Sequence, residues 1–264
     1  MSNISSVVHH PAFTDFLSIM TGPEVDSEGT NKAAFAPIVD AAEESQRLSD
    51  AVAALWQSLD DNLLARQTAL SGGATGKGKS NLQAWQESQF ALETLPIRIR
   101  DTVAAGVVAD LVFVSRVAEA ATGIAQRYAA LLDPVNAEWA NVRRQLSFAE
   151  ASHDTQEGKE ARSKPIREEL ARVARTATPI RHLYDLAMLT ASVADAWTET
   201  RYGFRISPET RVYTGYVPHS GVGSFQTAAN KRADAAYNHA LSRVKAAESA
   251  PLTMPAEGRT LIAA

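Results

Sequence analysis

The sequence contains no cysteine, which excludes a disulfide scaffold, cysteine-ligated zinc, iron–sulfur clusters and thiol catalysis. Its first residues, MSNI, lack the basic region and the apolar stretch of a secretory signal peptide. The longest apolar stretch, residues 103–114, is interrupted by Asp110 and is shorter than the roughly 20 apolar residues that a membrane-spanning helix needs. We therefore expect a soluble protein that works in a reducing compartment, with no membrane partner.

Aromatic residues make up only 7% of the chain, and the runs of β-branched residues that mark a sheet are scarce. Alanine, in contrast, accounts for 47 of the 264 residues, and it has the highest intrinsic helix propensity. Helices with alanine faces are thin on that side and can approach one another closely. This composition predicts an all-α fold.

The spacing of apolar residues divides the chain into three parts. Residues 1–39 are weakly patterned and interrupted by proline and glycine, so we expect an N-terminal arm. Residues 40–206 carry apolar residues at helical spacing and predict a helical-bundle core. Residues 207–264 predict a C-terminal extension, made of a loop and a last helix over about 228–248, on the outside of that core.

Within the core, glycine and proline set the helix ends that we expect. A first helix covers about 40–70 and stops at the glycines that follow. The next ends before Pro96, and another covers about 100–132. New helices are expected to begin at three later prolines, Pro134, Pro165 and Pro179.

Residues 73–80 (GATGKGKS) match the P-loop pattern GxxxxGKS. In a nucleotide-binding protein the loop that begins at Gly73 would surround phosphates with backbone N–H groups. Gly78 would allow the close approach, Lys79 would reach the outer phosphates, and Ser80 would bind magnesium. That chemistry requires a buried strand before the loop, and the segment before Gly73 has a helical pattern instead. A solvated Gly/Lys turn is therefore the preferred interpretation, with a nucleotide-binding protein as an alternative.

No catalytic constellation is evident in the sequence. The six histidines are scattered and none forms an HExxH pattern, and there is no G-x-S-x-G nucleophile elbow. Adjacent carboxylates such as Glu43 and Glu44 are typical of solvated helix faces. We expect a protein that is not an enzyme and has neither a cofactor nor a metal ion.

Charge is unevenly distributed over the chain, whose formal net charge is −4. The residues up to Asp60 include 9 acidic and 2 basic side chains, whereas Lys159 to Arg181 include 7 basic and 3 acidic ones. Two pairs of arginines lie next to apolar helical positions, a placement suited to binding phosphates. These are Arg98 with Arg100, and Arg143 with Arg144. Interhelical ion pairs are the alternative role for all four.

Three short segments resemble the coat proteins of rigid rod-shaped plant viruses of the tobamovirus, tobravirus and benyvirus type. Residues 199–206 (ETRYGFRI) resemble the closing motif of those proteins, with Thr198 in place of its phenylalanine and Trp197 one position earlier. Residues 141–144 (NVRR) resemble their paired arginines, and residues 95–114 resemble their Arg-Phe segment and the helix after it. The order of the three segments agrees, and about 58 residues follow the last one.

The resemblance implies a structural virion protein, a coat subunit that polymerises helically around single-stranded RNA. Arg143, Arg144, Arg98 and Arg100 would contact phosphates, while Glu199 and Tyr202, with Trp197 nearby, would secure the end of the bundle. The implied partners are further copies of the chain and single-stranded RNA, and the implied locations are the virion and the host cytoplasm. A non-catalytic helical adaptor protein of a phage particle, without nucleic acid, remains a further alternative.

Overall fold

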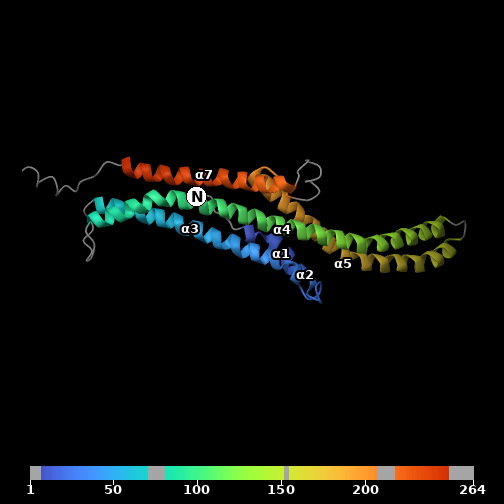
Figure 1. Ribbon diagram of the computed structural model, residues 1–264. Helices are drawn as coiled ribbons and strands as arrows, with labels where there is room; N and C mark the ends of the chain where they lie inside the picture. Colours follow the sequence, from blue (N-terminus) through green and yellow to red (C-terminus); the bar gives the residue numbers. More distant parts are fainter. Residues whose placement is uncertain (1–6, 71–80, 152–154, 207–217, 250–264) are drawn as a thin grey trace, which may run out of the picture. The chain divides into compact units, whose positions relative to one another are not determined.

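The computed structural model describes residues 7–70, 81–151, 155–206 and 218–249. These residues contain α-helices, a short 3₁₀ helix η1 (Val7–His9) and no strand, which confirms the prediction of an all-α fold (Figure 1). None of the described helices is long and apolar enough to cross a membrane. The helices are α1 (Pro11–Met20), α2 (Thr30–Ala34), α3 (Ala36–Leu70), α4 (Asn81–Ala151), α5 (Gln156–Tyr202) and α7 (Pro218–Ser249).

The chain divides into two compact units, each assembled from segments that are distant in sequence. Of the described residues, unit 1 contains 7–9, 38–70, 81–113 and 218–249, and unit 2 contains 10–37, 114–151 and 155–206. Because the division falls inside α4, this helix contributes to both units. The structure thus groups the chain differently from the expected arm, core and extension.

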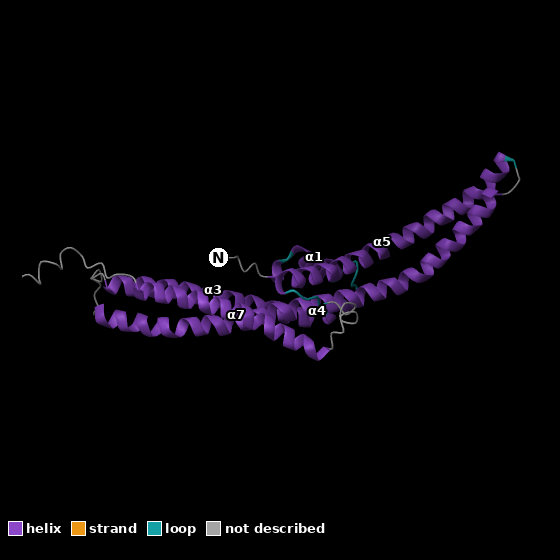
Figure 2. Cartoon of the chain, turned by 90° about the horizontal axis from the view of Figure 1, so that it is seen from above, coloured by secondary structure: helices purple, strands orange, loops and turns teal. Residues whose placement is uncertain are grey.

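Unit 1 is a bundle of α3, the first part of α4, and α7, which lie side by side in both Figure 1 and Figure 2. Helices α3 and α7 run parallel, because Asp60 pairs with Arg243 and, further along both helices, Arg66 pairs with Glu248 at 3.8 Å. Helix α4 runs antiparallel to α3, since Ser45 near the start of α3 donates a hydrogen bond to Asp110 late in this part of α4, at 2.6 Å.

The core of unit 1 draws on all three helices, and α7 belongs to it. Its buried residues are at most 6% exposed and comprise Leu59, Leu92, Leu95, Ile99, Ala240 and Val244. The expectation that the last helix lies outside the core is therefore wrong. Its small residues gave a weak amphipathic pattern, yet alanine allows α7 to pack closely on α3 and α4.

Residues 10–37 of unit 2 are folded and do not form the expected unpatterned arm. Helix α1 begins with proline at its first position, which suits a helix start, and it packs on α5. Its Phe13, Phe16 and Met20 are fully buried. The buried Asn31 of α2 connects this segment to its surroundings, because its amide donates to the carbonyl of Met20 at 2.9 Å and accepts from Arg127 of α4 at 3.1 Å.

The second part of α4 and helix α5 form an antiparallel pair. Glu138 bonds with Arg172 at 2.6 Å, and Glu150, further along α4, bonds with the earlier Arg167 of α5 at 2.7 Å. We call residues 133–151 of α4 and 156–182 of α5 the hairpin. Figure 2 shows the two helices of the hairpin running alongside each other.

Helices α4 and α5 continue through prolines that were expected to end or begin helices. Pro96 and Pro134 lie inside α4, and Pro165 and Pro179 lie inside α5. Each interior proline removes one backbone hydrogen bond and costs about 3 kcal/mol. Burial of apolar residues on both sides of a proline can offset that cost, as Leu95 and the fully buried Ile99 do around Pro96. The predicted helix boundaries at these four prolines are wrong.

Candidate nucleic-acid interface

Arg143 and Arg144 lie on the exposed surface of the hairpin. The adjacent Val142 is only 6% exposed and occupies the seam between the two helices, so neighbouring positions are turned away from the seam. Both arginines are exposed. The guanidinium of Arg143 lies over the ring of Trp139, with Cζ 4.9 Å from the ring centroid. Arg144 has no hydrogen-bond or ion-pair partner among the described residues.

Other basic side chains of the hairpin differ in whether a carboxylate neutralises them. Arg172 donates hydrogen bonds to Glu169 and Glu138, and these bonds raise the pKa of Arg172. Its positive charge is therefore already neutralised by carboxylates. Lys164 and Arg175 are exposed and have no carboxylate partner in the part of the chain that the structure describes. The hairpin therefore presents cations that remain available to a phosphate chain.

A groove of about 710 Å³ lies between the two helices, on the same side of α4 as Trp139. Three alanines contribute to its lining, and the half-buried Trp139 supplies its largest aromatic ring. Polar groups converge on it from both helices. The lining residues are Val135, Asn136, Trp139 and Ala140 of α4, and Ala174, Ala177, Thr178, Arg181, His182 and Asp185 of α5.

The other predicted phosphate ligands, Arg98 and Arg100, belong to unit 1. Arg98 is exposed on α4. Arg100 donates from Nε to Asp234 of α7 at 2.9 Å, which raises the pKa of Arg100 and makes it the interhelical ion-pair partner that was the alternative role. The arginines that sequence reasoning grouped together therefore lie in two different units, and one of the four already has an acidic partner.

The motif at residues 197–206 contains the C-terminal end of α5 and the residues that follow it. Gly203 adopts a left-handed conformation at φ 79°, and its N–H donates to the carbonyl of Glu199 at 2.9 Å. Trp197 and Tyr202 make an edge-on ring contact at 5.7 Å between centroids. The Glu199 carboxylate accepts from Arg205 at 2.7 Å, so the three predicted structural residues Trp197, Glu199 and Tyr202 all engage in local contacts at this helix end.

The P-loop residues Gly73, Gly78, Lys79 and Ser80 lie outside the described residues. The segment before them is α3, a helix that runs to Leu70. A phosphate-binding P-loop follows a buried strand, whereas the described segment that precedes residue 71 is this helix, as the sequence pattern predicted.

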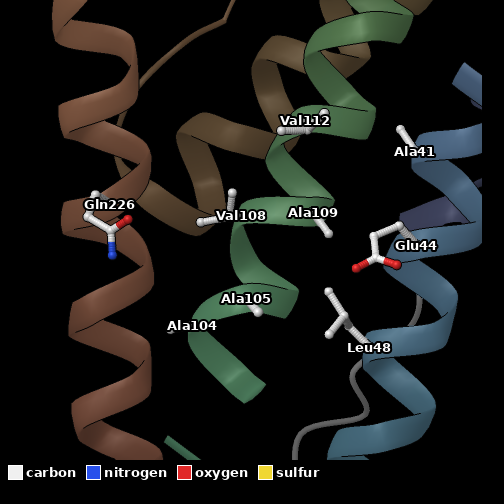
Figure 3. Close-up of a pocket in the computed structure, with 9 residues that line it drawn as sticks. All are labelled: Ala41, Glu44, Leu48, Ala104, Ala105, Val108, Ala109, Val112 and Gln226. Atoms are coloured by element: carbon white, nitrogen blue, oxygen red, sulfur yellow. The ribbon is translucent and has the colours of Figure 1, made fainter. Parts of the chain in front are cut away.

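A second groove, in unit 1, has a different chemistry. It measures about 400 Å³ and lies over α4 between α3 and α7. Figure 3 shows Glu44 and Leu48 extending from α3 toward Ala109 of α4, with Gln226 on α7 at the other side. The Glu44 carboxylate binds Arg47, and this bond lowers the pKa of Glu44. The residues that line this groove include no lysine or arginine, so it has no side chain that could neutralise a phosphate.

Among the described residues no group of three or more His, Asp or Glu side chains could hold a metal ion. Sequence reasoning predicted Arg143 and Arg144 as phosphate ligands but did not predict the groove beside them. The spacing of Trp139 and Arg143, four residues apart on one helix, was the available signal for an exposed aromatic–cation pair. The groove residues that α5 contributes could be identified only once the antiparallel pairing of α4 and α5 was known.

No family model, curated protein or solved structure matches this chain.

Proposed function

We propose that this protein is a non-catalytic structural subunit that assembles with copies of itself around single-stranded RNA, as a coat protein does. The observation that carries the proposal is the exposed Arg143–Arg144 pair of the hairpin, next to an aromatic ring and without a carboxylate partner among the described residues. Exposed cations beside an aromatic ring are the usual elements of a site for unpaired nucleic acid. The resemblance of three short motifs to rod-shaped virus coat proteins supports the same function.

The net charge of −4 fits such a subunit. A single acidic subunit binds RNA weakly because binding depends on local neutralisation of phosphates. When many subunits repeat the same arginine pair along one strand, the weak sites act together and the overall affinity rises. On this proposal the protein is found in virus particles and in the host cytoplasm where they form.

The exposed apolar side chains of the described helices support self-assembly. Phe148 on the hairpin is 77% exposed, and Phe90 and Leu64 of unit 1 are 70% and 64% exposed. Large apolar residues at such exposure are available for contacts with further copies. An assembling subunit accounts for them without any ligand pocket.

The test is the salt dependence of RNA binding, measured by fluorescence anisotropy with a labelled single-stranded RNA. In the double variant Arg143→Gln, Arg144→Gln, we expect weaker binding and a slope of log K against log salt that is smaller by about 1.4, since each phosphate contact contributes about 0.7. Glutamine keeps the hydrogen-bonding capacity and helix propensity while removing the charge.

The matched control is Arg116→Gln, Lys245→Gln, which also removes two positive charges from exposed positions outside the hairpin that have no carboxylate partner among the described residues. We expect this control to keep the wild-type slope. Equal loss of affinity in the two double variants would show that only total charge matters, and the proposed site would then be wrong.

A further inference from the structure

We propose that the groove between α4 and α5 binds an unpaired nucleobase, so that the hairpin contacts RNA through a base as well as through phosphates. This inference rests on the proposed function and specifies the ligand of the same surface. The groove volume of about 710 Å³ falls within the range of small-molecule sites. It is also open to solvent along exposed residues such as Ala140 and Ala174.

Trp139 belongs to the groove and also contacts one arginine of the Arg143–Arg144 pair. Trp139 lines the groove, and the guanidinium of Arg143 lies 4.9 Å from the centroid of the same ring. A base that stacks in the groove therefore has its own phosphate within reach of Arg143. Stacking of a base on an aromatic side chain does not depend on sequence, because every base has a π-face.

Alanine provides the space for the base. Ala140, Ala174 and Ala177 lie on facing sides of the groove, where larger side chains would interdigitate and close it. The groove spans Ala174 to Asp185 on α5, twelve residues that rise by about 16 Å along the helix. It is therefore long enough to hold a flat aromatic base rather than a single ion.

Polar groups in the groove match the edge of a base. Asp185 is exposed and has no partner among the described residues, so its carboxylate can accept a hydrogen bond from an amino or imino group. Asn136 accepts from Arg181 at 3.5 Å and keeps its amide N–H groups as donors. Arg181 adds positive charge at the same end, where it offsets the repulsion between Asp185 and a phosphate.

The direct test fills the groove without changing charge. Ala174→Leu introduces a larger side chain at an exposed position with little change in helix propensity. We expect the full-length variant to bind a labelled ten-nucleotide oligouridylate about 5- to 100-fold more weakly, the range that loss of one base–aromatic contact produces. The salt slope should stay at the wild-type value, since no phosphate contact is removed.

Two controls separate base binding from phosphate binding. Ala161→Leu places the same side chain at an exposed position of α5 outside the groove and should bind the oligonucleotide normally. Inorganic polyphosphate, which has no bases, should bind Ala174→Leu as tightly as the wild type but bind the Arg143→Gln, Arg144→Gln variant more weakly.

The outcomes distinguish the two proposals. Normal oligonucleotide binding by Ala174→Leu, together with weakened binding by the arginine double variant, would overturn the base site and leave the RNA-binding function intact. If the wild-type protein binds neither oligonucleotide nor polyphosphate, both proposals are wrong. Competition by free UMP at the concentration of the oligonucleotide would identify a free nucleotide as the ligand and overturn the assignment to an RNA strand.

Discussion

The bundle of unit 1 and the hairpin of unit 2 use helices of similar composition in opposite ways. In the bundle, three helices enclose large apolar residues such as Leu59, Leu92 and Ile99, each at most 1% exposed. In the hairpin, the buried residues are few and mostly small, and ion pairs such as that of Arg172 with Glu138 join the helices at the surface. The buried residues of the hairpin are Val142, Ser163, Val173 and Ala177.

The contrast indicates that the region with the larger apolar core and the region with the more accessible side chains are different parts of the molecule. Three helices can surround an apolar side chain and remove it from water, whereas two helices leave both outer faces of their seam exposed. The hairpin therefore keeps polar, cationic and aromatic groups accessible at the expense of its own stability. Elements that bind partners are often drawn from the less stable parts of a protein.

The largest effect is expected from removal of α7. A chain truncated after Ile206 loses Ala240 and Val244 and exposes the core residues that they cover on α3 and α4. We expect unit 1 to lose its cooperative fold and the truncated protein to aggregate, because a contiguous apolar core surface is left open. Circular dichroism and size-exclusion chromatography measure both effects. A soluble monomer with intact α3 and α4 would show that α7 is dispensable for the bundle.

The next largest effect is expected when a buried valine is replaced by alanine. Val244 in the bundle and Val142 in the hairpin form a matched pair, because both are 6% exposed. Replacement by alanine removes two methyl groups from each, a transfer cost of about 1.6 kcal/mol in both cases. We expect Val244→Ala to lower the free energy of unfolding by more than this amount, because a cavity enclosed by three helices cannot collapse fully. Val142→Ala should cost no more than the transfer term.

Urea denaturation of the two alanine variants, with hydrogen exchange to localise the change, checks this difference. An equal loss for Val142→Ala and Val244→Ala would mean that the hairpin is as tightly packed as the bundle.

Hydrogen exchange of the wild-type protein tests the same contrast without any mutation. Amides of the hairpin, for example around Trp139 and Val173, should open with a lower free energy than amides around Leu95 and Ile99 in the bundle. Mass spectrometry of peptides from the two regions is sufficient. Protection that is uniform along α4 would contradict the proposed difference in stability.

The smallest effect concerns the surface ion pairs of the hairpin. Hydrogen bonds from Arg172 lower the pKa of Glu169 below its usual value of 4.5, against a smaller opposing effect of burial. The pair therefore contributes stability above the usual pKa and loses it as the pH falls through the lowered pKa. In Arg172→Gln, NMR titration should show the pKa of Glu169 returning toward 4.5.

Glu44, whose pKa Arg47 lowers in unit 1, provides the internal reference for that titration and should not change in Arg172→Gln. An unchanged Glu169 pKa in this variant would show that the pair does not persist in solution.

The sequence was sufficient to predict the fold class and the helical phase, but it did not predict where the long helices end. Leu92, Leu95, Ile99 and Val103 keep one helical phase across Pro96. Helix propensity alone predicts that the helix ends at this proline, because proline is unfavourable inside a helix. Tertiary packing, which propensity does not include, decided the outcome.

The N-terminal segment carries a helical pattern of its own. Phe13, Phe16 and Met20 lie at spacings of three and four residues after Pro11, which is the pattern of an amphipathic helix with proline at its first position. The surrounding glycines and prolines obscured it. A short helix such as α1 is stabilised by the surface it packs on, so its existence depends on residues far away in sequence.

The candidate site could be predicted only in part. Exposure of Arg143 and Arg144 followed from their position beside the seam residue Val142. The pairing of Arg100 with Asp234 joins residues 134 positions apart, and no local pattern reveals such a contact. For the same reason the groove beside Trp139 became visible only when α5 was placed against α4.

Electron microscopy of negatively stained protein, with and without single-stranded RNA, tests the central claim most directly. The proposed function predicts rods or stacked rings of constant width for the wild type. Rods that protect RNA from nuclease should form with the wild type but not with Arg143→Gln, Arg144→Gln, whose circular dichroism should be unchanged. Wild-type protein that stays monomeric at high concentration in the presence of RNA, or a double variant that packages RNA normally, would contradict the account.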